Sequence, residues 1–337
     1  MSLLPADHPS FLNALSKAKS QVQDYLDKSD EFISAIANAA PEGVSDRMSN
    51  LLSRKGKKIR STILALIATS GEKAPDIERV SRSCAAIELL HLASLVHDDI
   101  IDETSVRRGQ RTAHIEWGNK IAVLIGDYIL SQAMSCVLNE KNAAIPMALA
   151  TAANDLIAGE INELDCTGNM ELPLERYSAI IRGKTASLVE ASAKMGAHLA
   201  GFNEDRVEKC GQLGMHFGIA FQIVDDLLDY GIGAKDLDKA KFTDISNGLV
   251  TLPLIYYFQS ASPSEKDSLI GLLKKAVEPN VAEEIRQRLQ NAKVFDRAKE
   301  TALQHISEAL AIAEDLPAKE HIVSLHEFIF SMTERGN

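Results

Sequence analysis

The spacing of proline leaves two long stretches of the chain free to form helices. None of the ten prolines falls between Asp76 and Ile145 or between Leu174 and Leu252. This matters because proline inside a helix removes a backbone donor and clashes with the preceding turn. Both stretches are rich in Ala, Leu, Ile, Glu and Lys, most of which favour helix. Alternating strand patterns are hard to find, so the sequence predicts an all-α fold.

Two segments predict helices at the centre of the protein. Residues Cys84–Val96 and Met215–Leu228 are apolar on nearly every side, which is typical of helices enclosed by others. Residues Asn280–Ala313 alternate charged and apolar side chains at helical spacing, as expected of an outer helix. No Pro-, Gly- or Ser-rich linker interrupts the chain. We therefore expect one domain over residues 1–337, a single large antiparallel helical bundle around a central cavity.

Composition excludes several classes of function. With 36 basic and 47 acidic side chains the formal net charge is −11, which disfavours generic binding to nucleic acid. No apolar run approaches the roughly 18 residues of a membrane span, and the N-terminus lacks the pattern of a secretory signal. Four cysteines without CxxC spacing predict neither disulfides nor a cysteine zinc site. No membrane span and a cytoplasmic location are the expectations.

Both central helices run into the same acidic pattern, DDxxD. The aspartates are Asp98, Asp99 and Asp102 in what we call the first comb, and Asp225, Asp226 and Asp229 in the second comb. Residues three and four apart share a helix face, so each comb presents neighbouring carboxylates that repel one another unless a cation lies between them. Oxygen ligands without His or Cys favour Mg²⁺ or Mn²⁺. One such cluster is as often a solvated helix end, but two predict metal-binding elements that face each other across a cavity.

Basic side chains that suit a metal-bound phosphate lie near the first comb. The densest basic segment is residues 54–60, although such a run alone is commonly a surface patch. Arg107 and Arg108 follow Asp102 by five residues, and the fixed donor fork of arginine matches phosphate. His91 lies two helical turns before Asp98 on nearly the same face, where a lone histidine is more often a satisfied core residue than a functional one.

Together these residues resemble the trans-type isoprenyl diphosphate synthases, the polyprenyl synthetase family. The resemblance runs from about Gly56 to Pro253 and is more general in the charged C-terminal helices. Residues 56–60 (GKKIR) are similar to the family's GKxxRP segment, with Ser61 in place of the proline, and residues 95–109 (LVHDDIIDETSVRRG) to its first aspartate-rich region. Further matches in the family's order are Gly126-Asp127-Tyr128, Gly159-Glu160, Gly183-Lys184-Thr185, Phe221-Gln222 and the second comb.

The resemblance implies a fold of the isoprenoid synthase type, a reaction and a set of roles. An allylic diphosphate bound through Mg²⁺ loses pyrophosphate, and isopentenyl diphosphate attacks the resulting cation to give a longer trans product. The isopentenyl diphosphate contacts implied by position are Lys57, Arg60, His91 and Arg108. The allylic diphosphate contacts are Arg107, Lys184, Thr185, Gln222 and Lys239. The implied metal ligands are Asp98, Asp102, Asp225 and Asp229, and Asp99, Asp226 and Lys184 join them as catalytic residues.

Three positions depart from the family's pattern. Leu249 stands where many relatives carry a lysine shortly before Thr251-Leu252-Pro253, so one phosphate-facing cation is missing. Phe242 stands where glycine is common, and Glu163 replaces a frequent glutamine. None of these departures touches the aspartates, so the resemblance still implies activity.

Small residues precede the first comb and bear on product length. In the family, bulky residues four and five positions upstream stop the growing chain early, and here those positions are Ser94 and Ala93, with Leu90 deeper along the helix. No Phe, Tyr or Trp occurs between Ile33 and Glu116. The resemblance therefore implies a product longer than the farnesyl class, destined for a quinone side chain and handed to a membrane enzyme. Alternatively, the small residues only let two helices pack closely.

Several alternatives stay open. A class I terpene cyclase shares the first comb but normally mixes Asn, Ser or Thr with Glu in the second. A His-Asp phosphohydrolase, suggested by His91 and His97-Asp98, leaves the second comb unexplained. A shorter-chain farnesyl or geranylgeranyl synthase is possible, as is a non-catalytic or weakly active subunit of a two-component prenyl synthase, for which Leu249 is the one hint. The resemblance otherwise implies a homodimer.

Overall fold

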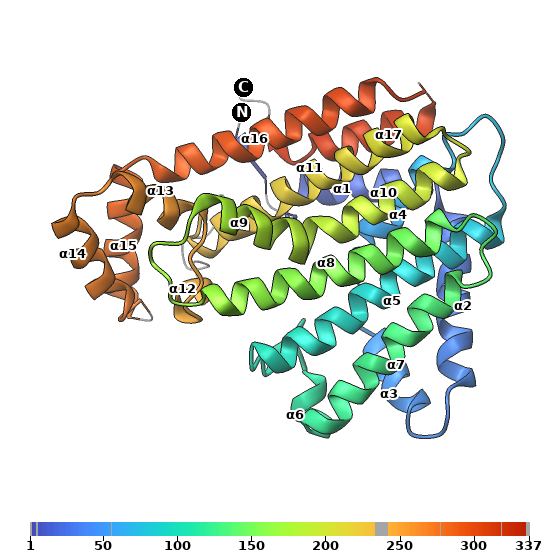
Figure 1. Cartoon of the computed structure of the whole chain (residues 1–337), viewed down its shortest axis with the longest axis horizontal. Helices are drawn as coiled ribbons and strands as arrows, with labels where there is room; N and C mark the ends of the chain where they lie inside the picture. The colour runs from blue at the N-terminus through green and yellow to red at the C-terminus, as the bar shows by residue number, and fades with distance from the viewer. Residues whose placement is uncertain are drawn as a thin grey trace.

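The protein is built almost entirely of helices (Figure 1), so the all-α prediction is confirmed. A computed structural model describes residues 2–4, 6–54, 56–232, 242–276, 278–317 and 319–334. The predicted substrate contact Lys239 lies outside the described residues.

The N-terminal half consists of helices and three short strands, two of which form a hairpin. Its elements are β1 (Ser2–Leu3), α1 (Pro9–Ser20), α2 (Gln23–Ala39), α3 (Ser45–Leu52), α4 (Ile59–Ala68), α5 (Ile77–Ile101), β2 (Val106–Arg107), β3 (Gln110–Arg111), α6 (Ala113–Trp117), α7 (Asn119–Val137) and α8 (Ala144–Cys166). The C-terminal half consists of α9 (Leu174–Ile181), the π-helical turn η1 (Arg182–Ala186), α10 (Ser187–Leu199), α11 (Glu204–Asp229), α12 (Thr243–Ser246), α13 (Leu252–Ser260), α14 (Pro263–Leu273), α15 (Pro279–Asn291), α16 (Val294–Glu314), α17 (Glu320–Phe330) and β4 (Thr333–Glu334).

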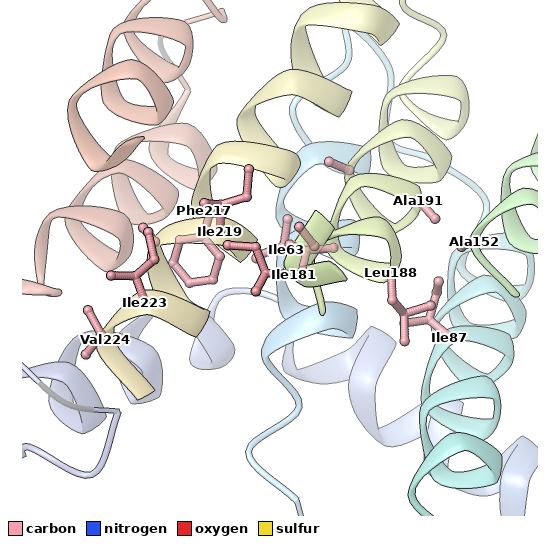
Figure 2. Packing of buried hydrophobic residues seen from close by; sticks show 14 of the residues in the cluster. Ile63, Ile87, Ala152, Ile181, Leu188, Ala191, Phe217, Ile219, Ile223 and Val224 are labelled. Carbon is pink, nitrogen blue, oxygen red and sulfur yellow. The ribbon is translucent and has the colours of Figure 1, made fainter. Parts of the chain in front are cut away.

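The two helices that end in the combs are enclosed by others, as predicted. Helix α5 packs along α7 and α2, and α11 packs along α16 and α10. Helix α10 lies between α4, α8 and α11 and joins the two halves. Figure 2 shows the resulting core, in which Ile63 of α4, Ile87 of α5, Leu188 of α10 and Phe217 of α11 are all buried. Because both long helices are fixed along their length, their C-terminal ends hold the combs in defined positions.

The predicted outer helix over Asn280–Ala313 is wrong as a single element. It is two helices, α15 and α16, separated at Ala292 and Lys293. The φ angle of Lys293 is 57°, in the left-handed region that ends a right-handed helix. Only one face of α16 is exposed, because Phe295, Ala302 and Ile306 are buried and the helix packs on α11. The charged pattern described its exposed face alone.

A small hairpin that the sequence did not predict holds the arginine pair. Strands β2 and β3 pair antiparallel, with Val106 opposite Arg111 and Arg107 opposite Gln110. Arg108 and Gly109 form the two-residue turn with φ angles of 51° and 76°, and positive φ at both positions is the requirement of the hairpin turn that best matches strand twist. The strands are too short for an alternating pattern, and the turn lacks the usual Asn-Gly. A second ladder, Ser2–Leu3 with Thr333–Glu334, joins the two ends of the described chain.

One helix among the described residues passes a test of length and composition for a membrane span. It is α7, with a mean hydropathy of 1.3 over its most apolar window, of which 33% is buried. A single such helix is weak evidence, because core helices pass the same test. Here α7 packs against α5 and α6, and its exposed apolar side chains bear on assembly below.

Two histidines link α11 to α16. Their Nδ1 atoms, of His216 and His305, lie 2.8 Å apart, so one ring donates its proton to the other. Burial and the neighbouring His216 lower the pKa of His305 to about 4, and burial also lowers the pKa of His216. Arg182 lowers both pKa values further, whereas Glu308 opposes the shift. The pair is therefore uncharged at neutral pH.

We expect this pair to make folding stability depend on pH. A histidine whose pKa is lower in the folded state gives full stability above its unfolded pKa near 6.5, and that stability is lost as the pH falls toward 4. Replacing His305 by Gln should therefore shrink the fall in melting temperature between pH 7 and pH 4 relative to the unmodified chain, measured by thermal denaturation. An unchanged difference between the two pH values would show that the pair does not titrate with unfolding.

Candidate active site

The first comb occupies the C-terminal end of α5. Asp98 is half-buried, Asp99 is only 4% exposed, and Asp102 caps the helix in an exposed position. Asp99 accepts a 2.6 Å hydrogen bond from Nε of Arg107. The short hairpin thus holds Arg107 against the inner aspartate, and this bond leaves the terminal nitrogens of the fork for another ligand.

The second comb occupies the C-terminal end of α11 and shows the same division. Asp225 is exposed and Asp226 is only 4% exposed. Asp229 accepts hydrogen bonds of 3.0 and 3.1 Å from the backbone N–H groups of Thr243 and Asp244, at the start of α12. In each comb the inner carboxylate is the most buried, and it accepts hydrogen bonds from protein side chains.

Two glycines bring a lysine to the combs. A Cβ atom on Gly159 of α8 would lie 2.4 Å from the backbone nitrogen of Lys184, and one on Gly183 would lie 2.6 Å from a carbonyl oxygen of α8. Only glycine allows this approach of η1 to α8, and π-helical turns of this kind are frequent at functional sites. As a result Lys184 forms an ion pair of 2.9 Å with Glu160 and a second, closer one with Glu163.

The glutamates of α8 place Lys184 within electrostatic reach of both combs. Asp102 of the first comb contributes to the raised pKa of Glu163, after burial as the main cause. Glu163 in turn contributes to the raised pKa of Asp226 and of Asp244. The pKa of Lys184 itself is raised, because Glu163 and Glu160 outweigh the opposing effect of burial. The structure therefore brings both combs to one site, with Lys184 inside it.

This site has an excess of carboxylates. Burial, and then Glu160, raises the pKa of Asp98 to about 7. Burial raises the pKa of Asp226 to about 7 against two opposing hydrogen bonds, and burial with Asp226 and Asp229 raises that of Asp244 to about 8. Such high pKa values mean that these buried carboxylates have too little positive charge around them. A divalent cation would supply it, and the all-oxygen donor set fits Mg²⁺ or Mn²⁺.

The carboxylates do not form a finished coordination cage. Within the described ranges, no three His, Cys, Asp or Glu side chains converge as a metal-binding group. Mg²⁺ usually takes one or two carboxylates and completes its octahedron with waters and substrate phosphates. The arrangement of the combs therefore suits a cation that arrives together with a phosphorylated ligand.

A chain of hydrogen bonds connects the second comb to η1. The hydroxyl of Tyr177 on α9 donates to Oδ2 of Asp226 at 2.6 Å, and the amide of Gln222 donates to Oδ1 at 2.8 Å. Thr185 donates to Oε1 of Gln222 at 2.6 Å. The structure thus joins two predicted substrate contacts, Thr185 and Gln222, to an aspartate. Tyr177 was missed, because its spacing in the sequence carries no signal.

Three of the predicted isopentenyl diphosphate contacts, Arg60, His91 and Arg108, lie within electrostatic reach of one another. Burial, and then the charges of Arg60, Arg108 and Arg107, lower the pKa of His91 well below its usual range. The ring is therefore neutral at pH 7, and an anion among these arginines would favour its protonation. Arg108 also donates to the backbone oxygen of Arg54 at 3.0 Å. Where positive side chains outnumber the negative ones beside them, the local potential favours binding of an anion.

Lys57, the fourth of these predicted contacts, is exposed at the opening of the site. Burial lowers its pKa, and the attraction of Asp225 is among the effects that oppose this. Ser61, which stands at the family's proline position, uses the backbone donor that proline lacks. Its N–H and its hydroxyl both donate to Oε1 of Glu88 on α5, at 3.3 and 2.6 Å. The departure from the pattern thus adds two bonds between α4 and α5.

The predicted chain-length residues are buried along α5. Leu90, Ala93 and Ser94 are 3%, 2% and 9% exposed, and the hydroxyl of Ser94 donates to the carbonyl of His91 at 2.9 Å. They lie one to two turns before the first comb, on the part of α5 that packs against neighbouring helices. Their role in product length stays a prediction.

Two cavities are lined in part by α8. One of about 650 Å³ is bounded by Asp155 and Gly159 of α8 and by Ser178 of α9, and one of about 290 Å³ lies farther along α8, near Met147. Neither is lined by an aspartate of the combs. The candidate site is therefore defined by the side chains at the helix ends and not by either cavity.

Comparison with known proteins places this arrangement in a family. Residues 41–290 match the sequence profile of the polyprenyl synthetase family. The chain belongs to this family. It is 33% identical over 298 residues to a nonaprenyl diphosphate synthase of Mycobacterium tuberculosis, covering 87% of this chain and 88% of the relative. The family resemblance inferred from the two combs is thereby confirmed.

Other members differ in the product that their names specify. A short chain isoprenyl diphosphate synthase of Methanothermobacter thermautotrophicus is 30% identical over 316 residues, covering 91% of this chain and 96% of the relative. The crystal structure of a decaprenyl diphosphate synthase from Rhodobacter capsulatus superposes with a TM-score of 0.87 at 25% identity, covering 94% of this chain and 98% of that one. The isoprenoid synthase type of fold is confirmed, and membership alone does not set product length.

Proposed function

We propose that this protein is a trans-polyprenyl diphosphate synthase, which condenses isopentenyl diphosphate with an allylic diphosphate. The observation that carries the proposal is the convergence of both combs on Lys184, with Arg107 held by Asp99 at its edge. An excess of carboxylates beside fixed cations is suited to a metal-bound diphosphate. The separate group of Arg60, His91 and Arg108 supports a second diphosphate site nearby.

The residues present give each substrate a place. Asp98, Asp102, Asp225 and Asp229 would hold Mg²⁺, or Mn²⁺ in its place, and the bound metal would neutralise the leaving diphosphate. Arg107, Lys184 and Thr185 bind the allylic diphosphate, and Gln222 orients Thr185. Lys57, Arg60, His91 and Arg108 bind isopentenyl diphosphate and hold its double bond next to the allylic carbon. Because α5 carries His91 and also leads into the first comb, the two substrates are kept side by side.

We further propose a long-chain product, for use in a quinone side chain. Small side chains at Ala93 and Ser94 and the absence of aromatic residues between Ile33 and Glu116 support it. The nonaprenyl and decaprenyl synthases among the similar proteins point the same way, whereas the short-chain relative favours the alternative of a shorter product. A cytoplasmic location, with the product handed to a membrane enzyme, belongs to the same proposal.

The competing proposal is an inactive or weakly active subunit of a two-component synthase. Its one support is Leu249, which stands at a position where a lysine would face phosphate and whose backbone N–H bonds to the carbonyl of Asp244 at 2.8 Å. Against it, both combs and the Lys184 group are intact, so this chain has the side chains that turnover needs.

One assay separates these proposals. The purified chain alone is incubated with a farnesyl primer, isopentenyl diphosphate and Mg²⁺, and the products are identified by mass. We expect a polyprenyl diphosphate several isoprene units longer than the primer, and none when the metal is chelated. Absence of elongation by the chain alone, with activity on adding a second component, would support the subunit proposal, and arrest after one addition would support a shorter-chain synthase.

We also propose that the chain forms a homodimer through α7 and α8. Large apolar side chains are exposed on these two helices, which contact each other: Ile121, Val123, Leu124, Met147, Ile157, Ile161 and Leu164. Exposed apolar side chains that gather on one face typically mark a protein interface. Sedimentation should give twice the chain mass of 36.7 kDa. A Leu124→Glu variant should shift toward the single-chain mass. If this variant stays dimeric, the interface does not involve Leu124.

A further inference from the structure

The inner aspartate of each comb is buried and is held by protein side chains. Asp99 and Asp226 are each only 4% exposed, and protein side chains donate to both. Asp226 accepts on both carboxylate oxygens, from Tyr177 at 2.6 Å and from Gln222 at 2.8 Å. A buried carboxylate held in this way on each oxygen is restrained in rotation, so it is suited to orienting other groups.

We propose that Tyr177 is a positioning residue for the allylic diphosphate, acting through Asp226, Gln222 and Thr185. This inference rests on the proposed function, since it concerns the same diphosphate site. Tyr177 lies on α9, is 4% exposed, and is one helical element away from the predicted contacts on η1. Its hydroxyl is linked to Thr185 through the hydrogen-bonded chain of Asp226 and Gln222.

Each link in this chain sets the orientation of the next. Oδ1 of Asp226 accepts from the NH₂ group of Gln222 at 2.8 Å, so the nitrogen end of this amide faces Asp226. The Gln222 oxygen then faces Thr185, whose hydroxyl donates to it at 2.6 Å. Thr185 is thereby fixed beside Lys184, its neighbour on the same π-helical turn. Removing the Tyr177 hydroxyl frees one oxygen of Asp226, and the orientation of all later links is then less restricted.

The hydrogen-bonded chain connects side chains of three elements. Tyr177 belongs to α9, Asp226 and Gln222 to α11, and Thr185 to η1. Asp226 lies beside Asp225, one of the predicted metal ligands, so the network also fixes the end of α11 that carries the second comb. A displacement here affects the diphosphate and its metal together, whereas the Arg60 and His91 group lies outside the network.

The test is binding of inorganic diphosphate in the presence of Mg²⁺, measured by calorimetry. Tyr177→Phe should weaken this binding by about three- to tenfold, an effect of the size seen for coupled contacts. In the turnover assay the KM for the allylic substrate should rise by a similar factor, with the KM for isopentenyl diphosphate unchanged. Tyr256→Phe is the matched control, because it removes one hydroxyl partner, Thr301 at 2.9 Å, between α13 and α16.

A double-mutant cycle shows whether Tyr177 acts through Thr185. The Tyr177→Phe and Thr185→Val changes together should weaken binding no more than Thr185→Val alone.

A second variant is available if Tyr177→Phe fails to fold. Gln222→Met interrupts the same chain of hydrogen bonds and must weaken diphosphate binding. Full additivity, an equal effect of Tyr256→Phe, or unaltered binding in Tyr177→Phe or in a Gln222→Met chain would each overturn the proposal. Normal diphosphate binding without any turnover would instead refute the proposed function and leave this network standing; no binding at all refutes both.

Discussion

Replacing Asp98 by Asn, or Asp225 by Asn, is expected to lower kcat by on the order of a hundred- to a thousandfold, the size seen when a preorganised electrostatic contact to a transition state is removed. These positions belong to different helices, yet both combs lie about the Lys184 group. Loss of either carboxylate removes a ligand for the cation that the site needs. Turnover of the farnesyl primer, followed by release of diphosphate, measures the effect.

Stability should move in the opposite direction for Asp98. The folded protein raises the pKa of this carboxyl to about 7, so its ionised form is unfavourable in the fold above pH 4 and fully so above pH 7. Without metal at pH 8, Asp98→Asn should therefore melt at the same or a higher temperature than the unmodified chain. The difference should vanish below pH 4, where the carboxyl is protonated in both states.

A matched carboxylate change controls for charge alone. Asp155 lies on the same helix as Glu160 and Glu163 but lines the outer cavity, away from the combs. Asp155→Asn should leave turnover within about twofold, as is usual for surface substitutions. If either comb variant retained full activity, the assignment of the metal site would be wrong.

Replacing Ala93 by Phe is expected to shorten the product by several isoprene units. Ala93 is 2% exposed and lies five residues before Asp98 on α5. An aromatic ring at this depth would block a chain that grows along the helix. Mass analysis of the product ladder from a farnesyl primer, with a large excess of isopentenyl diphosphate, measures the change.

A second position tests the same prediction at a greater depth along α5. Leu90 lies one turn deeper, about 4.5 Å along a helix that rises about 1.5 Å per residue. Leu90→Phe should therefore give a product longer than that of Ala93→Phe by about one isoprene unit, yet shorter than that of the unmodified chain. Overpacking costs about 1–3 kcal/mol, so thermal melting must first confirm that each variant is folded. Identical ladders in all three chains would show that α5 does not line the product tunnel.

Local patterns in the sequence predicted most of the helices and the identity of the site. Proline spacing and apolar segments located α5 and α11, because a helix that is enclosed by others has apolar residues on every side. The combs were evident since their spacing is a property of a single helix. The same reasoning failed for residues 280–313, where the charged pattern described exposed faces and contained no sign of the left-handed turn at Lys293.

The contacts between distant residues were beyond the sequence. Nothing near Tyr177 indicates Asp226, which lies 49 positions away and meets it only in the folded chain. Glu163 was noted as a departure, but its pairing with Lys184 depends on the close approach of Gly159 and Gly183. The hairpin that presents Arg107 to Asp99 also escaped, because strands of two residues carry no periodic signal.

The sequence by itself determined that this chain is helical, that two helices end in carboxylates, and that it belongs with the polyprenyl synthetases. These properties follow from side chains that are neighbours along one helix. Only the tertiary structure decided which aspartate of each comb is buried and bonded to protein side chains, and which cations lie beside them. The reason is physical: burial and hydrogen bonding of Asp99 and Asp226 arise from α9, η1 and the hairpin, which the chain brings to the helix ends only when it is folded.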